Sequence, residues 1–220
     1  MSVAKTPQVI SVMRPRKEQA LERPGRDIIR WGGAFQSGLP LAAALFLVVS
    51  IFLPYWHLTL HAPQYPGGLD LTAFVNRLSG DVEEIDGLNH YIGMRKLDTA
   101  GRVERLISVY AIPLMAVATA AFALLRSKWA LVLGIPVVVF PLVFIGDLFF
   151  WLYDSGHDLD PTAALSSSIE PFTPAVFGNG RVGQFETTAN FEAGFYLALL
   201  AAIGVLAAYF LRWRAGKRGA

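Results

Sequence analysis

The sequence contains no cysteine. Disulfide bridges, thiolate metal sites and haem attachment through a Cys-x-x-Cys-His motif are therefore excluded. Any metal ion would have to be held by histidine, methionine, carboxylate or backbone groups.

Charged residues are also scarce. They make up 16% of the 220 residues, while apolar residues make up 54%; an ordinary soluble domain has about 25% charged residues. The apolar residues form four blocks, at about 35–56, 106–125, 129–153 and 193–211. Each block approaches or exceeds the ~18–20 residues that cross a bilayer core, and none alternates like a β-strand. We therefore predict an all-α membrane protein with four transmembrane helices.

Lysine and arginine are distributed unevenly around these predicted helices. Thirteen of the 19 lie in the N-terminal segment, in the short connection at 126–128 or in the C-terminal tail. By the positive-inside rule, both termini face the cytoplasm, and loops 57–105 and 154–192 face outward. The two long loops would pack together as a small extracytoplasmic cap. The net charge of +2 hides this asymmetry, and we expect no binding to nucleic acid.

The predicted helices divide the chain into three parts. We expect a disordered cytoplasmic tail over 1–33, because this segment is rich in charge and proline. A four-helix transmembrane domain with its two outer loops would follow over 34–213, and a short cytoplasmic tail over 214–220.

All four histidines fall in the predicted outer loops: His57, His61, His90 and His157. His90 and Met94 are four residues apart in LNHYIGM, a spacing that places both side chains on one face of a helix. Imidazole suits copper, zinc and iron, and thioether sulfur selects Cu(I). We therefore predict that a copper ion is held by His61, His90, Met94 and His157.

Several acidic residues are weaker candidates for the same site. Asp86, Asp158 and Asp160 lie close in sequence to the predicted ligands. Asp147 falls inside the third predicted helix, where a carboxyl group needs water or a partner. Asp147 could instead be a protonated or interfacial acid that hydrogen-bonds another helix.

The other candidates have structural alternatives as well. His57, beside two aromatic residues, could be an interfacial anchor, and a lone histidine in a turn often bonds only to backbone. Met94 could be a core residue. No phosphate-binding loop, nucleophile elbow or His-Glu-x-x-His motif occurs, so we expect no enzymatic activity.

Four segments follow one another in the two loops: APQYPGGLDL, GDVEEIDGLNHYIGM, YDSGHDLDP and PFTPAVFGNGRVGQF. Together they resemble a poorly characterised family of four-span bacterial membrane proteins that are often encoded beside the maturation genes of nitrous-oxide reductase, a copper enzyme. The resemblance covers both loops, and the family's Asn-His-Tyr-Ile-Gly-Met and Gly-His-x-Leu-Asp-Pro cores match at His90, Met94 and His157. It implies copper handling by association and a location in the bacterial inner membrane.

Two hypotheses about function follow. In the first, the outer cap binds copper and delivers it to a periplasmic or membrane copper enzyme. In the second, the protein is a structural or assembly subunit, and the cap is a docking surface for other membrane subunits. A small-solute permease fits less well, because no paired row of charges lines a pore.

Overall fold

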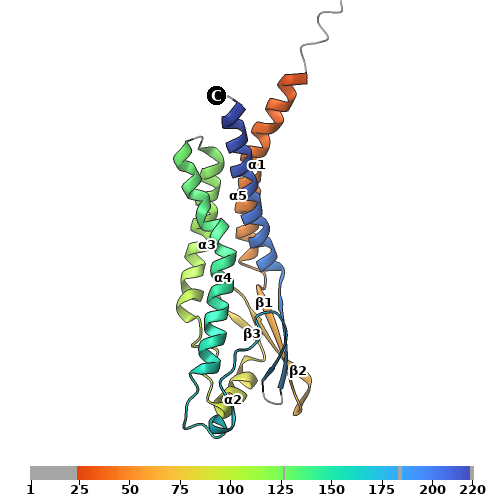
Figure 1. The fold of residues 1–220 in the computed structure, drawn as a ribbon, viewed down its shortest axis with the longest axis vertical. Helices are drawn as coiled ribbons and strands as arrows, with labels where there is room; N and C mark the ends of the chain where they lie inside the picture. The colour runs from red at the N-terminus through yellow and green to blue at the C-terminus, as the bar shows by residue number, and fades with distance from the viewer. Residues whose placement is uncertain (1–23, 126, 183–184, 219–220) are drawn as a thin grey trace, which may run out of the picture.

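The computed structural model describes residues 24–125, 127–182 and 185–218. The molecule is elongated, with long helices along one end and a small β-sheet with a short helix at the other (Figure 1). In chain order its elements are α1 (Pro24–Ser50), β1 (Trp56–Ala62), β2 (Tyr65–Ala73), β3 (Leu78–Gly80), α2 (Val82–Ile92), α3 (Arg102–Leu124), η2 (Lys128–Ala130), α4 (Leu131–His157), η3 (Ser166–Ser168), β4 (Gly178–Val182), β5 (Phe185–Phe191) and α5 (Ala193–Arg218).

Within the described residues, three helices are long and apolar enough to cross a membrane: α3, α4 and the Ala193–Lys217 part of α5. The apolar part of α1 is shorter, Gln36–Ser50. The first apolar block in the sequence reached residue 56, but the chain leaves the helix at Ser50, and Trp56 already belongs to β1. The prediction of four transmembrane helices is therefore wrong.

The prediction of an all-α fold is also wrong, because the two long loops at 57–105 and 154–192 build a five-stranded antiparallel sheet. The strand order is β3-β2-β1-β5-β4. The first loop supplies β1, β2 and β3, and the second supplies β4 and β5. Pairing of β1 with β5 joins the two loops in one sheet. In that pairing Trp56 lies opposite Phe191 and His61 lies opposite Glu186.

The strands have one apolar face, which the alternation of side chains explains. Trp56, Leu58, Leu69, Leu71 and Ala189 are buried on this face and pack with Ile85 of α2 and with the outer part of α4. Proline and glycine in YPGGL conceal this alternation in β2. The segment LDLTAFVNRL, which contains the end of β2, was compatible with an amphipathic helix or a strand when read alone.

The helices pack around a core built largely from small residues. On α5, Ala198, Ala201, Ala202 and Ala208 are each at most 4% exposed. Small side chains allow neighbouring helices to approach closely, and α1 packs along α5, with its N-terminal part diverging from that helix (Figure 1). Leu47 of α1 is fully buried in this core.

Tyr55 joins the helices to the sheet. Its hydroxyl group donates a hydrogen bond to Ser50 Oγ (2.7 Å), which itself donates to the carbonyl oxygen of Leu47. Its backbone is bonded to both sheet-forming segments, since its amide donates to the Ala73 carbonyl and its carbonyl accepts from the Glu192 amide. Burial raises the pKa of the Tyr55 phenol from 10.0 to about 12.

The two predicted tails fall partly outside the described part of the chain. Residues 1–23 of the first and 219–220 of the second are not described, and the chain belongs to α1 from Pro24 and to α5 up to Arg218. The connection between α3 and α4 and the C-terminal end of α5 lie at the end of the molecule opposite the sheet (Figure 1).

Candidate functional site

The LNHYIGM segment forms the end of α2 and the turn that follows. Gly93 adopts a left-handed conformation (φ 86°), and the Met94 amide donates a hydrogen bond to the Asn89 carbonyl oxygen. This is the usual way for a glycine to end a helix. His90 therefore lies in the last turn of the helix and Met94 just beyond it.

The segment that follows α4 is attached to this turn through its backbone. The Asp160 amide donates to the Gly93 carbonyl (2.8 Å), and the Leu165 amide donates to the Tyr91 carbonyl (2.9 Å). A Cβ atom on Gly93 would lie 2.8 Å from the Asp160 carbonyl oxygen. Only glycine allows this approach, so the turn has a clear structural role.

A cavity of about 220 Å³, the outer pocket, lies where the two segments meet. His90, Met94 and Asp160 line it, together with Tyr91, Gly93, Thr162, Ala163 and Ala164. The Asp160 carboxylate accepts hydrogen bonds from the Thr162 amide and hydroxyl, and these bonds, with a smaller contribution from His90, lower the pKa of Asp160. An imidazole, a thioether and a carboxylate thus share one pocket.

The other two predicted copper ligands lie elsewhere. His61 is exposed on β1 beside β5. His157, at the end of α4, stacks its ring on Tyr153 and bonds through Nδ1 to the carbonyl oxygen of the same residue (2.9 Å). Neither lines the outer pocket.

Two of the weaker candidates make structural contacts. Asp86 accepts a hydrogen bond from the Leu97 amide (2.7 Å), and Asp158 pairs with Arg95, which also pairs with Asp154. In the part of the chain that the structure describes, no three histidine or acidic side chains are grouped to hold a metal ion. The predicted four-ligand site is therefore reduced to His90 and Met94, with Asp160 beside them.

An interfacial anchor was one of the roles predicted for His57, which belongs to β1. Its ring nitrogens contact the hydroxyl groups of Thr72 (3.0 Å) and Thr59 (3.2 Å). Nε2 also lies 3.3 Å from the Asp70 carboxylate. These contacts occupy both ring nitrogens, and the residue has a structural role across β1 and β2.

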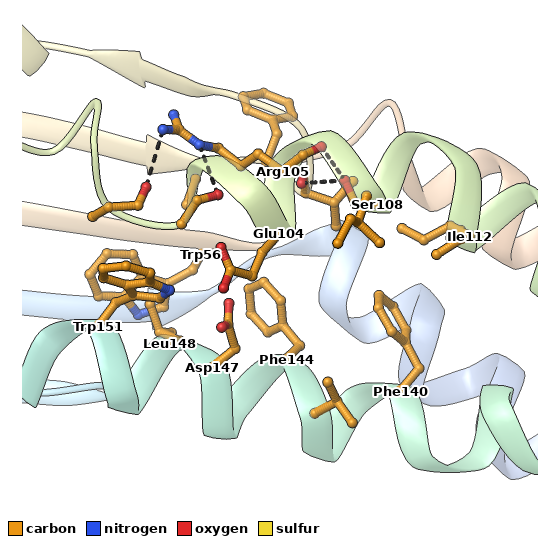
Figure 2. Close-up of a pocket in the computed structure, with 18 of the residues that line it drawn as sticks. Trp56, Glu104, Arg105, Ser108, Ile112, Phe140, Phe144, Asp147, Leu148 and Trp151 are labelled. Atoms are coloured by element: carbon orange, nitrogen blue, oxygen red, sulfur yellow. Dashed lines mark hydrogen bonds between the residues drawn. The ribbon is translucent and has the colours of Figure 1, made fainter.

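A larger cavity, of about 540 Å³, lies between α3, α4 and the apolar face of the sheet; we call it the groove (Figure 2). Its walls are almost entirely apolar. Leu71, Ala73 and Leu78 contribute from the strands, and Ile112 and Phe140 from the helices.

The groove opens between the two helices. Ile107, Val139 and Val143 line it and are also 56%, 41% and 57% exposed. Because α3 and α4 are both long and apolar enough to cross a membrane, these residues would face lipid. The groove therefore opens on the side that would meet the bilayer.

Two carboxyl groups face each other at the end of the groove nearest the sheet. Glu104 reaches in from the first turn of α3 and Asp147 from α4, with their carboxyl groups directed toward each other (Figure 2). Neither forms an ion pair with a basic residue in the described ranges. The sequence singled out Asp147; it did not single out Glu104, whose role depends on the position of α3 against α4.

The neighbouring Arg105 does not neutralise these carboxyl groups. Its guanidinium donates hydrogen bonds to the carbonyl oxygens of Asp98, Ala100 and Gly101. Its remaining ionic partner is the Asp98 carboxylate, at 3.9 Å. Arg105 therefore stabilises the turn before α3 through these backbone hydrogen bonds.

One buried donor at the same end has no hydrogen-bond partner. The indole nitrogen of Trp151 is buried and bonds to no acceptor among the described residues. The Asp147 carboxyl group lies near this nitrogen but does not reach hydrogen-bonding geometry. An unpaired buried donor carries a free-energy cost, which a ligand with an acceptor could relieve.

Comparison of the chain with family models, curated proteins and solved structures finds no match. The resemblance of the outer loops to the family found near nitrous-oxide reductase genes therefore stays a prediction.

Proposed function

We propose that the protein is a membrane-embedded binding protein that holds an amphiphilic, lipid-like molecule in the groove. The observation that carries this proposal is the combination of a long apolar cavity with two carboxyl groups and an unpaired indole donor at one end. Its volume, about 540 Å³, falls in the range of small-molecule sites, which are mostly apolar with a few polar groups. An amphiphile has the same division into an apolar tail and a polar head.

The orientation of this site in the membrane follows from charge. The connection between α3 and α4 and the end of α5 carry Arg126, Lys128, Arg212 and Arg214, which the positive-inside rule assigns to the cytoplasmic side. The sheet and the polar end of the groove would then lie at the outer surface of a bacterial inner membrane. The cytoplasmic position of the N-terminus remains a prediction from the sequence.

The proposal is tested by a substitution that places a larger side chain in the groove. Ala111 lines the groove on α3, whereas Leu114 on the same helix is 69% exposed and does not. We expect Ala111→Phe to reduce the amount of lipid that co-purifies with the detergent-solubilised protein, measured by mass spectrometry, and Leu114→Phe to leave it unchanged. Equal lipid content in wild type and both variants would contradict the proposal.

Copper handling on the outer face is the second candidate function. It is favoured by the sharing of the outer pocket by His90 and Met94, two groups that suit Cu(I). Delivery to a periplasmic or membrane copper enzyme would follow from binding at this exposed position. A non-catalytic assembly role is the remaining alternative if neither a lipid nor copper binds.

The copper candidate is tested by titrating the purified protein with Cu(I) and Cu(II). Met94→Leu keeps the size and apolar character of the side chain, and we expect it to weaken Cu(I) binding markedly and Cu(II) binding little. His90→Ala should weaken both. His61→Ala is the matched control, because His61 lies outside the pocket; equal affinities in wild type, Met94→Leu and His90→Ala would exclude this site.

A further inference from the structure

We propose that the groove selects amphiphiles whose head group carries a primary ammonium, held between Glu104 and Asp147. This inference rests on the proposed function and adds the chemical class of the ligand. A phospholipid with an ethanolamine head group is the membrane lipid with this chemistry.

The charge at this end of the groove favours a cationic head group. Two carboxyl groups from different helices face each other at the rim of an apolar cavity (Figure 2), and no basic residue in the described part of the chain pairs with either. Two carboxylates in such surroundings repel each other unless a cation or a shared proton lies between them. The nearby guanidinium of Arg105 is already bonded to three carbonyl oxygens, so a cation placed between the two carboxylates would come from the ligand.

The number of hydrogen-bond donors distinguishes a primary ammonium from other cations. A primary ammonium has three N–H donors, and a carboxylate accepts through two oxygens. One ammonium can therefore bridge Glu104 and Asp147 with charge-assisted hydrogen bonds, which are the stronger kind. A quaternary ammonium carries the same charge but has no N–H donor, so it cannot form this bridge.

Aromatic side chains surround the two carboxyl groups. Trp56, Phe144 and Trp151 line the same end of the groove, and aromatic faces attract cations. The buried indole N–H of Trp151 lacks an acceptor. In an ethanolamine phospholipid the phosphate follows the ammonium after two carbons and would supply that acceptor.

The apolar remainder of the groove fits the rest of such a molecule. Ile112 and Phe140 lie along α3 and α4 beyond the carboxyl groups (Figure 2), and Met115, Pro136 and Val139 line the cavity as well. An acyl chain could follow this wall and leave between the helices into the bilayer. A soluble amine would leave the wall unfilled, and hydrophobic burial would contribute nothing to its binding.

The experiment compares lipids that differ only in the head group. The full chain is purified in detergent and titrated with phosphatidylethanolamine, phosphatidylcholine and phosphatidylglycerol of identical acyl chains, with binding followed by native mass spectrometry. We expect phosphatidylethanolamine to bind about tenfold or more tighter than the other two, since the bridge adds charge-assisted hydrogen bonds. Glycerophosphoethanolamine, the head group without acyl chains, should bind far more weakly.

Substitutions at the two carboxyl groups test recognition of the head group separately from binding of the acyl chains. Glu104→Gln with Asp147→Asn should abolish the preference for phosphatidylethanolamine while lipid binding itself persists. Glu170→Gln is the matched control: it removes one negative charge from an exposed position outside the groove and should keep the preference. Should the double variant fail to fold, Glu104→Gln alone still tests the preference for phosphatidylethanolamine. Glu104 is exposed, so this substitution should leave the fold intact.

Each outcome has a defined meaning. Equal binding of the three lipids would overturn the ammonium inference and leave the amphiphile groove standing. Equal binding of phosphatidylethanolamine and phosphatidylcholine, both above phosphatidylglycerol, would also overturn it, because attraction to the aromatic rings alone would then explain the selectivity. Tight binding of glycerophosphoethanolamine would show a site for soluble amines, and absence of all lipid binding would overturn the proposed function as well.

Discussion

The backbone of Asp160 lies directly against Gly93. A Cβ atom on this glycine would be 2.8 Å from the carbonyl oxygen and 2.9 Å from the amide nitrogen of Asp160. The same two residues share a backbone hydrogen bond of 2.8 Å. The end of α2 and the segment after α4 are thus joined at one point, 67 residues apart in the chain, and the outer pocket exists because of this contact.

Gly93→Ala should therefore destabilise the outer part of the protein. The added methyl group meets backbone that cannot move aside, and alanine is strained at φ 86°; a cost of about 1–3 kcal/mol is expected. Gly87→Ala is the control, since Gly87 lies in the same helix with open space around it and alanine favours helix. Thermal unfolding of the purified protein measures both, and equal stability of the two variants would contradict the packing described here.

Asp86 should behave as a structural acceptor rather than a metal ligand. Its carboxylate accepts the Leu97 amide at 2.7 Å, so Asp86→Ala should lower the free energy of unfolding by about 1 kcal/mol. Asp86→Asn retains a carbonyl acceptor, so its free energy of unfolding should fall by less. Chemical denaturation measures the stabilities and copper titration the affinities; loss of copper binding in Asp86→Asn, with normal stability, would assign the residue to a metal site instead.

Tyr55 should make the stability sensitive to alkaline pH. Its pKa is about 12 in the folded protein and 10.0 as the reference value for the unfolded chain. Below pH 10 the phenol is protonated in both the folded and the unfolded state, and its contribution to the free energy of unfolding is complete. Between pH 10 and pH 12 the unfolded chain ionises first, so stability falls as pH rises, by about 1 kcal/mol at pH 11.

The measurement compares thermal unfolding at pH 8 and pH 11. Tyr55→Phe should be less stable than wild type at pH 8, because it loses the hydrogen bond to Ser50, and the difference should narrow at pH 11. Tyr110→Phe removes a phenol that is 72% exposed and should retain the pH dependence of the wild type. A constant difference between Tyr55→Phe and wild type at both pH values would contradict the buried state of this phenol.

The direction of the protein in the membrane can be measured with reporters. A green fluorescent protein fused after Ala220 should fluoresce, because it would lie in the cytoplasm, where the basic residues after α5 are expected. Alkaline phosphatase inserted near Ser167, in the short η3 turn on the sheet side, should be active because it would lie outside. An inactive insertion at Ser167 with an active phosphatase after Ala220 would reverse the orientation.

The sequence by itself determined the features that depend on local composition. Long apolar runs predict membrane-crossing helices wherever they occur, because backbone groups in lipid must bond within their own segment; α3, α4 and α5 meet this prediction. The spacing of His90 and Met94 predicted one helix face for both; α2 ends at Ile92, so Met94 instead follows the turn at Gly93. The two side chains line one pocket.

Only the tertiary structure decided the sheet and the groove. β1 and β5 are separated by more than a hundred residues and pair across the two loops, so reading each loop alone did not predict the sheet. His61 and His157 could not be placed relative to His90 for the same reason. Glu104 and Asp147 face each other because α3 packs beside α4 in one register, and spatial proximity between distant segments is set by packing, which no local pattern of residues encodes.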